Sequence, residues 1–147
     1  MTEEELTIAL LEYLQANEWD IVCYDFPQSG TGRMIHPDDT NSKTEGGIIP
    51  DIVAVKKGVC LFFENKDHYD HPDFEKQGSL RSTTKYMKSI RQLLKGKNYS
   101  KIYYGIAIPE KSVVCVTNDD KNLIDFIITL DNNLNPNIFY NSFGLIL

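Results

Sequence analysis

The sequence predicts a mixed α/β fold in which a central mixed β-sheet is flanked by helices. Residues 6–14 place apolar side chains at helical spacing. Residues 52–55 and 59–63 are two short apolar runs separated by Lys57 and Gly58, which is the pattern of a β-hairpin. Residues 101–108 are apolar on both faces, as a strand in the middle of a covered sheet is.

The composition is that of one globular domain. The chain has 147 residues, of which 41% are hydrophobic and 24% are charged, so we expect a single domain over residues 1–147. No apolar run approaches the roughly 18 residues of a membrane span, and the acidic start is unlike a signal peptide. Cys23, Cys60 and Cys115 lack paired spacing. These features predict a cytoplasmic protein with reduced, buried thiols.

The first third of the chain predicts a helix, a strand and a long loop. Thr2 suits a helix N-cap, and the helix should end near Asn17. Residues 19–26 are rich in β-branched and aromatic side chains, which favours a strand. Residues 28–47 are polar and without periodicity, so we expect either a functional loop or a disordered surface loop.

The second half predicts further helices and strands. Residues 73–94 fit a helix that either kinks or splits at Gly78 and Ser79. Residues 101–108 and 112–117 fit two strands, and residues 121–131 fit a helix. The short apolar runs of the tail, residues 138–140 and 145–147, suit an edge strand or a subunit interface.

The hairpin brings charged residues together at one end. If Lys57 and Gly58 form the turn, counting outward places Asp51 opposite Glu64, with Lys66 on the same face and Asn65 pointing away. Opposed carboxylates repel each other, and this repulsion is tolerated when a divalent cation lies between them. Hard oxygen ligands favour Mg²⁺ or Mn²⁺ over Zn²⁺.

This pattern resembles the signature of the PD-(D/E)XK nuclease superfamily. The signature is Pro-Asp, a variable gap and Asp/Glu-x-Lys; here Pro50 and Asp51 are followed, after 12 residues, by Glu64, Asn65 and Lys66. The resemblance implies a restriction-endonuclease-like core and Mg²⁺-dependent hydrolysis of DNA, with Mn²⁺ as a substitute. It also implies that the metal is ligated by Asp51, Glu64 and the Asn65 carbonyl. Lys66 then stabilises the developing charge or helps to deprotonate the attacking water.

The resemblance further implies a glutamate from the first helix, and Glu3 and Glu4 are the candidates. At about 100° per residue, Glu3 lies on the apolar face and Glu4 at its edge, whereas Glu5 points away. The alternative is that these acids only complement the helix dipole.

The distribution of basic residues suggests where DNA would bind. The net charge of −6 argues against a nonspecific nucleic-acid binder but leaves a selective one open. Residues 76–101 contain basic side chains and no acid. The DNA-contacting candidates are Arg81, Lys85 and Lys88 from this segment and Arg33 and Lys43 from the polar loop.

We therefore expect a restriction-type endonuclease acting on duplex DNA, as a homodimer because cutting both strands needs two active sites. Two alternatives stay open: a structure-specific nuclease for Holliday junctions or repair, and a non-catalytic binding or partner subunit with the same fold. His68 and His71 invite a zinc hypothesis, but Pro72 disfavours helical spacing, so an exposed polar loop is expected instead.

Overall fold

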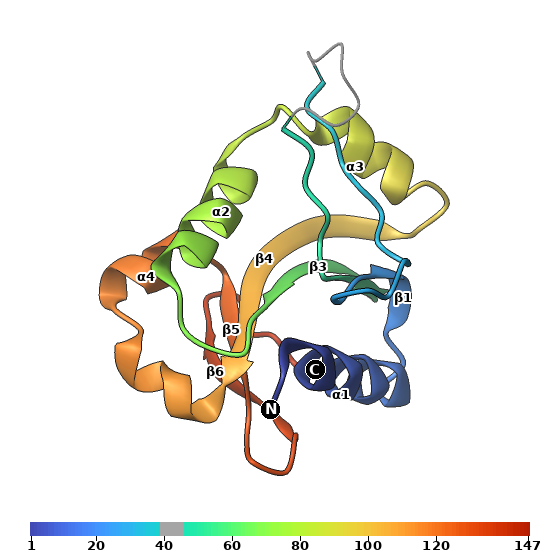
Figure 1. Ribbon diagram of the computed structural model, residues 1–147. Helices are drawn as coiled ribbons and strands as arrows, with labels where there is room; N and C mark the ends of the chain where they lie inside the picture. Colours follow the sequence, from blue (N-terminus) through green and yellow to red (C-terminus); the bar gives the residue numbers. More distant parts are fainter. Residues whose placement is uncertain (39–45) are drawn as a thin grey trace.

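The computed structural model describes residues 1–38 and 46–147, which form a six-stranded mixed sheet with helices on both faces (Figure 1). The strands lie in chain order: β1 (Asp20–Tyr24), β2 (Ile52–Lys56), β3 (Gly58–Asn65), β4 (Tyr99–Pro109), β5 (Phe126–Leu130) and β6 (Pro136–Asn141). β4 is parallel to both β3 and β5, and the other neighbours are antiparallel. The predicted α/β class and mixed sheet are therefore confirmed.

The helices divide between the two faces of the sheet. On one face lies α1 (Glu3–Ala16), which begins with a capping box between Thr2 and Glu5. The other face is covered by α2 (His71–Ser82), α3 (Met87–Leu93) and α4 (Asn118–Leu123). Among the described residues, none of the helices has the length and hydrophobicity needed to cross a membrane.

Strand β3 contributes side chains to a hydrophobic cluster on each face of the sheet. Its residues alternate between the faces, so Leu61 and Phe63 pack in the core under α1 while Cys60 and Phe62 pack in the core under α3. The strand is buried from Cys60 to its end. Chain leaving the end of β3 therefore emerges from the interior of the molecule.

The β2–β3 hairpin has the predicted turn. Lys57 and Gly58 both have positive φ angles, 50° and 82°, which is the geometry of a tight two-residue hairpin. Lys56 pairs with Val59, as the sequence predicts. At the open end the ladder becomes irregular, because the Asp51 N–H donates to the Phe63 carbonyl (3.1 Å).

The long segment between β1 and β2 extends past the sheet and lies beside α3 (Figure 1). Ile35 and Ile48 form an antiparallel bridge that joins its two arms. Ile35 is buried, and the Tyr86 hydroxyl donates to the Gly46 carbonyl (2.7 Å). Its described residues are thus attached to the helical layer.

The helix expected over residues 73–94 is split into two helices, but the expected position of the break, Gly78 and Ser79, is wrong. The chain leaves helical geometry at Thr83, where β-branched residues are weak helix formers. Gly78 lies inside α2, where a Cβ would come 3.1 Å from Leu123. This glycine therefore allows α4 to approach α2 closely.

The strand expected at residues 112–117 is also wrong. Glu110–Cys115 form a 3-10 helix in which only Ser112 is buried. Val114 is 86% exposed and Cys115 is exposed, whereas Cys23 and Cys60 are buried as expected.

The helix expected at residues 121–131 is α4 followed by strand β5. All of β5 is buried. A continuous apolar run fits helical and strand periodicity equally well, which explains the error. The tail contributes β6, so the edge-strand alternative for residues 138–140 is confirmed.

Replacing Gly105 of β4 with alanine should destabilise the fold. A Cβ there would lie 2.3 Å from the Phe126 ring, and overpacking of this kind costs about 2–3 kcal/mol. Urea denaturation of Gly105→Ala measures the loss, with Lys101→Ala on the exposed part of β4 as the control. A loss below about 0.5 kcal/mol would mean that the ring moves aside freely.

Candidate active site

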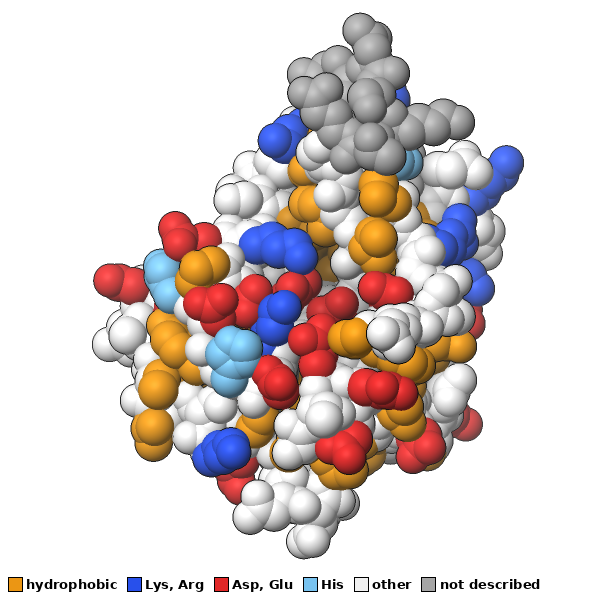
Figure 2. Space-filling view, in the orientation of Figure 1, with side chains coloured by type: hydrophobic (Ala, Val, Ile, Leu, Met, Phe, Trp, Pro, Cys, Tyr) orange, Lys and Arg blue, Asp and Glu red, His pale blue; other side chains and the backbone are white. Residues whose placement is uncertain are grey.

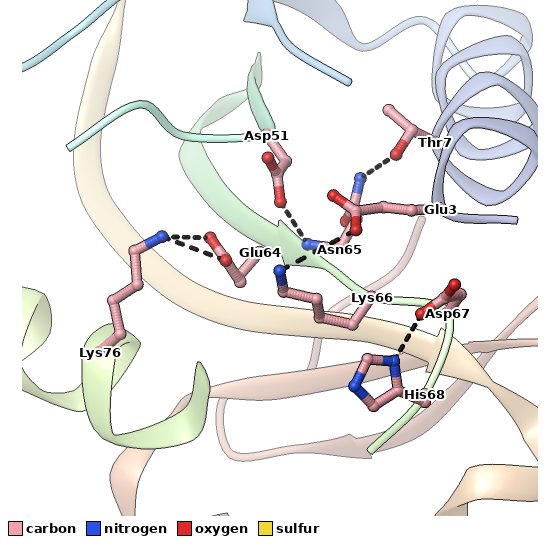
Figure 3. A network of polar contacts seen from close by, with 9 residues as sticks. All are labelled: Glu3, Thr7, Asp51, Glu64, Asn65, Lys66, Asp67, His68 and Lys76. Carbon is pink, nitrogen blue, oxygen red and sulfur yellow. Dashed lines mark hydrogen bonds and ion pairs between the residues drawn. The ribbon is translucent and has the colours of Figure 1, made fainter. Parts of the chain in front are cut away.

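The charged residues of the motif meet at the open end of the hairpin (Figure 3). Asp51 directly precedes β2, while Glu64 and Asn65 end β3 and Lys66 follows. Asp51 is 9% exposed and Glu64 is 5% exposed. The structure thus brings the motif residues together in a buried place.

The two carboxylates are crowded. The backbone N–H of Asn65 donates to Asp51 Oδ2 (2.7 Å). Burial and then the charge of Glu64 raise the pKa of Asp51 from 3.8 to about 8, which this hydrogen bond only partly offsets. The surroundings of Asp51 therefore disfavour its charged form.

Two lysines supply positive charge to the site. Lys76 of α2 places Nζ 3.1 and 3.0 Å from the two carboxylate oxygens of Glu64. Lys66 Nζ lies 3.9 Å from Glu3 Oε2. Burial lowers the pKa of Lys66, but surrounding carboxylates, led by Glu3, raise it further, so the net shift is upward. Lys66 is therefore a cation.

Of the two candidate helix glutamates, only Glu3 contacts the motif in the structure. Glu3 is partly buried beside Lys66, whereas Glu4 is exposed. The helix carrying them is fastened to the site, since the Asn65 side chain donates to Thr7 Oγ1 (3.1 Å). The predicted outward direction of the Asn65 side chain is confirmed, which leaves its backbone carbonyl as the proposed ligand.

The residues present fit a hard divalent cation. Within residues 1–38 and 46–147, no group of three or more His, Cys, Asp or Glu side chains is arranged to hold a metal. Mg²⁺ does not need one, because it commonly keeps several waters and binds through one or two carboxylates. The raised pKa of Asp51 means that its charged form is disfavoured, and a bound cation would stabilise that form.

The DNA-contacting candidates are spread over the helical layer. Lys85 and Lys88 are exposed near and on α3, and Lys85 Nζ lies 5.5 Å from the centre of the Tyr86 ring. Arg33 is exposed on the β1–β2 segment. Figure 2 shows the grouped acids at the centre of one face, with basic side chains among them and beyond.

The other two DNA-contacting candidates are Arg81 and Lys43. The guanidinium of Arg81 is engaged by α4 and its following turn, with bonds to the Asn122 carbonyl (2.6 Å) and Asp125 (3.2 Å). Arg81 therefore ties α2 to α4 in this structure. Lys43 lies outside the described residues.

Two residues of α2 join the site without having been predicted as part of it. Lys76 lies in the basic segment, but the sequence does not indicate its contact with Glu64. Asp73 has a buried Oδ2 atom for which the described residues supply no hydrogen-bond partner, and burial raises the pKa of Asp73. The available signal is their spacing of three residues near the start of a helix that follows the motif.

The histidines take part in a structural contact. His71 Nδ1 and the Tyr69 hydroxyl both bond the buried carboxylate of Asp120, at 2.5 and 2.8 Å, which fastens the loop after the motif to α4. His68 contacts Asp67 instead. This arrangement gives no support to the zinc hypothesis.

No family model matches this chain, and neither the curated proteins nor the solved structures compared with it give a match.

Asp51→Asn should change the pH dependence of stability in metal-free buffer. The folded state holds the Asp51 proton more tightly than the unfolded chain does, so this group's contribution to the free energy of unfolding falls as pH rises from 3.8 to about 8. The amide can still accept from Asn65, and we expect the variant to be more stable than wild type by roughly 1–2 kcal/mol at pH 9.

Urea denaturation with a chelator between pH 5 and pH 9 measures this difference. Glu12→Gln, which removes an exposed carboxylate from α1, controls for the change in net charge. If the wild-type and Asp51→Asn curves run parallel over this range, the crowding of the carboxylates is too weak to shift the protonation of Asp51.

Proposed function

We propose that this protein is a metal-dependent endodeoxyribonuclease with a restriction-endonuclease-like core. The observation that carries the proposal is the convergence of Asp51, Glu64 and Lys66 at the buried end of one hairpin, with Glu3 of α1 beside them. Ordinary surface strands do not bury opposed carboxylates, because the repulsion lowers stability.

The chain's own residues divide the chemistry between them. Asp51, Glu64 and the Asn65 carbonyl would hold Mg²⁺ or Mn²⁺, which when bound polarises the scissile phosphate and acidifies a water. Lys66 is held as a cation by the acids around it, so its role is to stabilise negative charge that develops on the phosphate.

The surroundings suit a nucleic-acid backbone. A hollow beside the site is lined by side chains from α2 and the turn before α3, including Lys76, Ser79, Thr83 and Lys85. Ammonium and hydroxyl groups of this kind contact phosphate and sugar oxygens, which positions a protein on DNA. The hollow also borders Ile48 of the β1–β2 segment, and we propose that this segment contributes to selectivity.

A restriction-type enzyme that cuts duplex DNA needs two active sites, and we propose a homodimer. In this chain, strand β6 lies at one edge of the sheet, and its Ile138 and Phe139 side chains are 37% and 42% exposed. An edge strand with unpaired backbone groups favours pairing with another chain. The buried thiols of Cys23 and Cys60 suit the reducing cytoplasm.

Wild-type protein should cut plasmid DNA into discrete bands in Mg²⁺, and Asp51→Ala and Lys66→Ala should each lower the rate by roughly 10²–10³-fold. Gel assays on plasmid and on branched DNA test this, with Lys111→Ala, an exposed residue of the 3-10 helix, as the control. Cutting of branched DNA alone would indicate a structure-specific nuclease. No cutting of either substrate in Mg²⁺ or Mn²⁺ would indicate a non-catalytic subunit.

The two helix glutamates should behave differently. Glu3 contacts Lys66, so Glu3→Gln should lower the cleavage rate roughly tenfold through loss of positioning. Glu4→Gln makes the same chemical change one residue away on an exposed side chain and should leave the rate unchanged. Equal effects would show that α1 contributes only its charge.

A further inference from the structure

The contact between Lys76 and Glu64 occupies the carboxylate that the metal needs. Lys76 Nζ lies within 3.0 and 3.1 Å of both oxygens, on a Glu64 side chain that is only 6% exposed. Its ammonium therefore gives Glu64 the neutralising charge that a bound cation would give (Figure 3).

This lysine is free to leave without moving its helix. Its side chain is 40% exposed, and its stem is long and flexible. The helix α2 is held by other groups: Phe74 is buried, and Gln77 Nε2 donates to the carbonyls of Phe62 (3.1 Å) and Gly105 (2.8 Å). Displacing the ammonium thus costs little beyond the ion pair itself.

A divalent cation and the ammonium compete for the same oxygens. Two cations on one carboxylate repel each other strongly in a buried place, where water screens little. A cation shared between Asp51 and Glu64 would therefore push Lys76 off at least one oxygen. In the metal-free protein, the ion pair conversely weakens metal binding.

Phosphate offers the released ammonium a new partner. Lys76 also lines the hollow that runs to Lys85, with the hydroxyls of Ser79 and Thr83 between them. A nucleic-acid backbone along this path would place an anionic oxygen within reach of either lysine. No other residue of α2 both lines this hollow and contacts a motif carboxylate, within the part of the chain that the structure describes.

We propose that Lys76 is a displaceable counter-ion, which neutralises Glu64 before the metal binds and moves to a nucleic-acid phosphate when the metal arrives. This inference rests on the proposed nuclease function. Its consequence is positive coupling: metal frees the lysine for phosphate, and phosphate removes the metal's competitor. Such coupling is reciprocal, so each ligand strengthens binding of the other by the same factor.

The first test measures Mn²⁺ binding without DNA, by the electron paramagnetic resonance signal of the free ion. Lys76→Met keeps the stem and removes the charge, and it should bind Mn²⁺ roughly tenfold more tightly than wild type. Lys76→Arg should stay near the wild-type affinity, and Lys111→Met on an exposed site should be unchanged. Thermal melts of all variants check that they are folded.

The second test measures DNA affinity against salt in a Lys66→Ala background, where we expect cleavage to be slow. With Mn²⁺ present, adding Lys76→Met should reduce the slope of log affinity against log salt by about one, since one phosphate contact is lost. Without Mn²⁺ the same substitution should leave the slope unchanged, because Lys76 is then held by Glu64.

The outcomes separate this inference from the proposed function. Unchanged or weaker Mn²⁺ binding by Lys76→Met, while Asp51→Asn abolishes binding, would overturn the counter-ion role and leave the metal site standing. Mn²⁺ binding that is absent from wild type, or insensitive to Asp51→Asn, would overturn both. If Lys76→Met reduces the salt slope by about one both with and without metal, Lys76 is a permanent DNA contact and the exchange is refuted.

Discussion

Repulsion between the carboxylates of Asp51 and Glu64 is the constraint on which this end of the molecule depends. The hairpin holds both groups in a buried place, where the pKa of Asp51 is raised to about 8. The groups around them reduce the resulting penalty: the Asn65 N–H and the ammonium of Lys76. Proteins commonly retain such unfavourable electrostatics where function requires it, and a large apolar core offsets the loss of stability.

Side chains alternate along β3, so Glu64 and Asn65 make their contacts on opposite faces of the sheet. Phe62 belongs to the core covered by the α3 layer, and Glu64, two residues on, points toward Lys76 of α2. Asn65 points to the opposite face, where it bonds Thr7 of α1. Glu64 thus faces the charged site, while its neighbour Asn65 fastens α1, the helix that carries Glu3.

Local patterns in the sequence were sufficient for the hairpin and for α1, because turn residues, capping and periodicity act over a few positions. They failed at β5, where a fully buried run of apolar residues carries no period that distinguishes a strand from a helix. They also missed Lys76, since its contact with Glu64 depends on how the crossover between β3 and β4 lays α2 over the sheet. Glu3 lay between these cases: helical geometry placed it on the correct face, but only tertiary packing showed its contact with Lys66.

The bridge between Ile35 and Ile48 has a consequence for how this architecture can diversify. It joins the two arms of the β1–β2 segment outside the strands that carry the motif, and the Gly46 carbonyl beyond it accepts from the Tyr86 hydroxyl. Loop-closure entropy grows slowly, by about 0.6 kcal/mol for each doubling of length. A change in the length of the chain between Ile35 and Ile48 should therefore cost little in closure entropy. The length of this segment can therefore change while the hairpin that carries Asp51 and Glu64 stays the same.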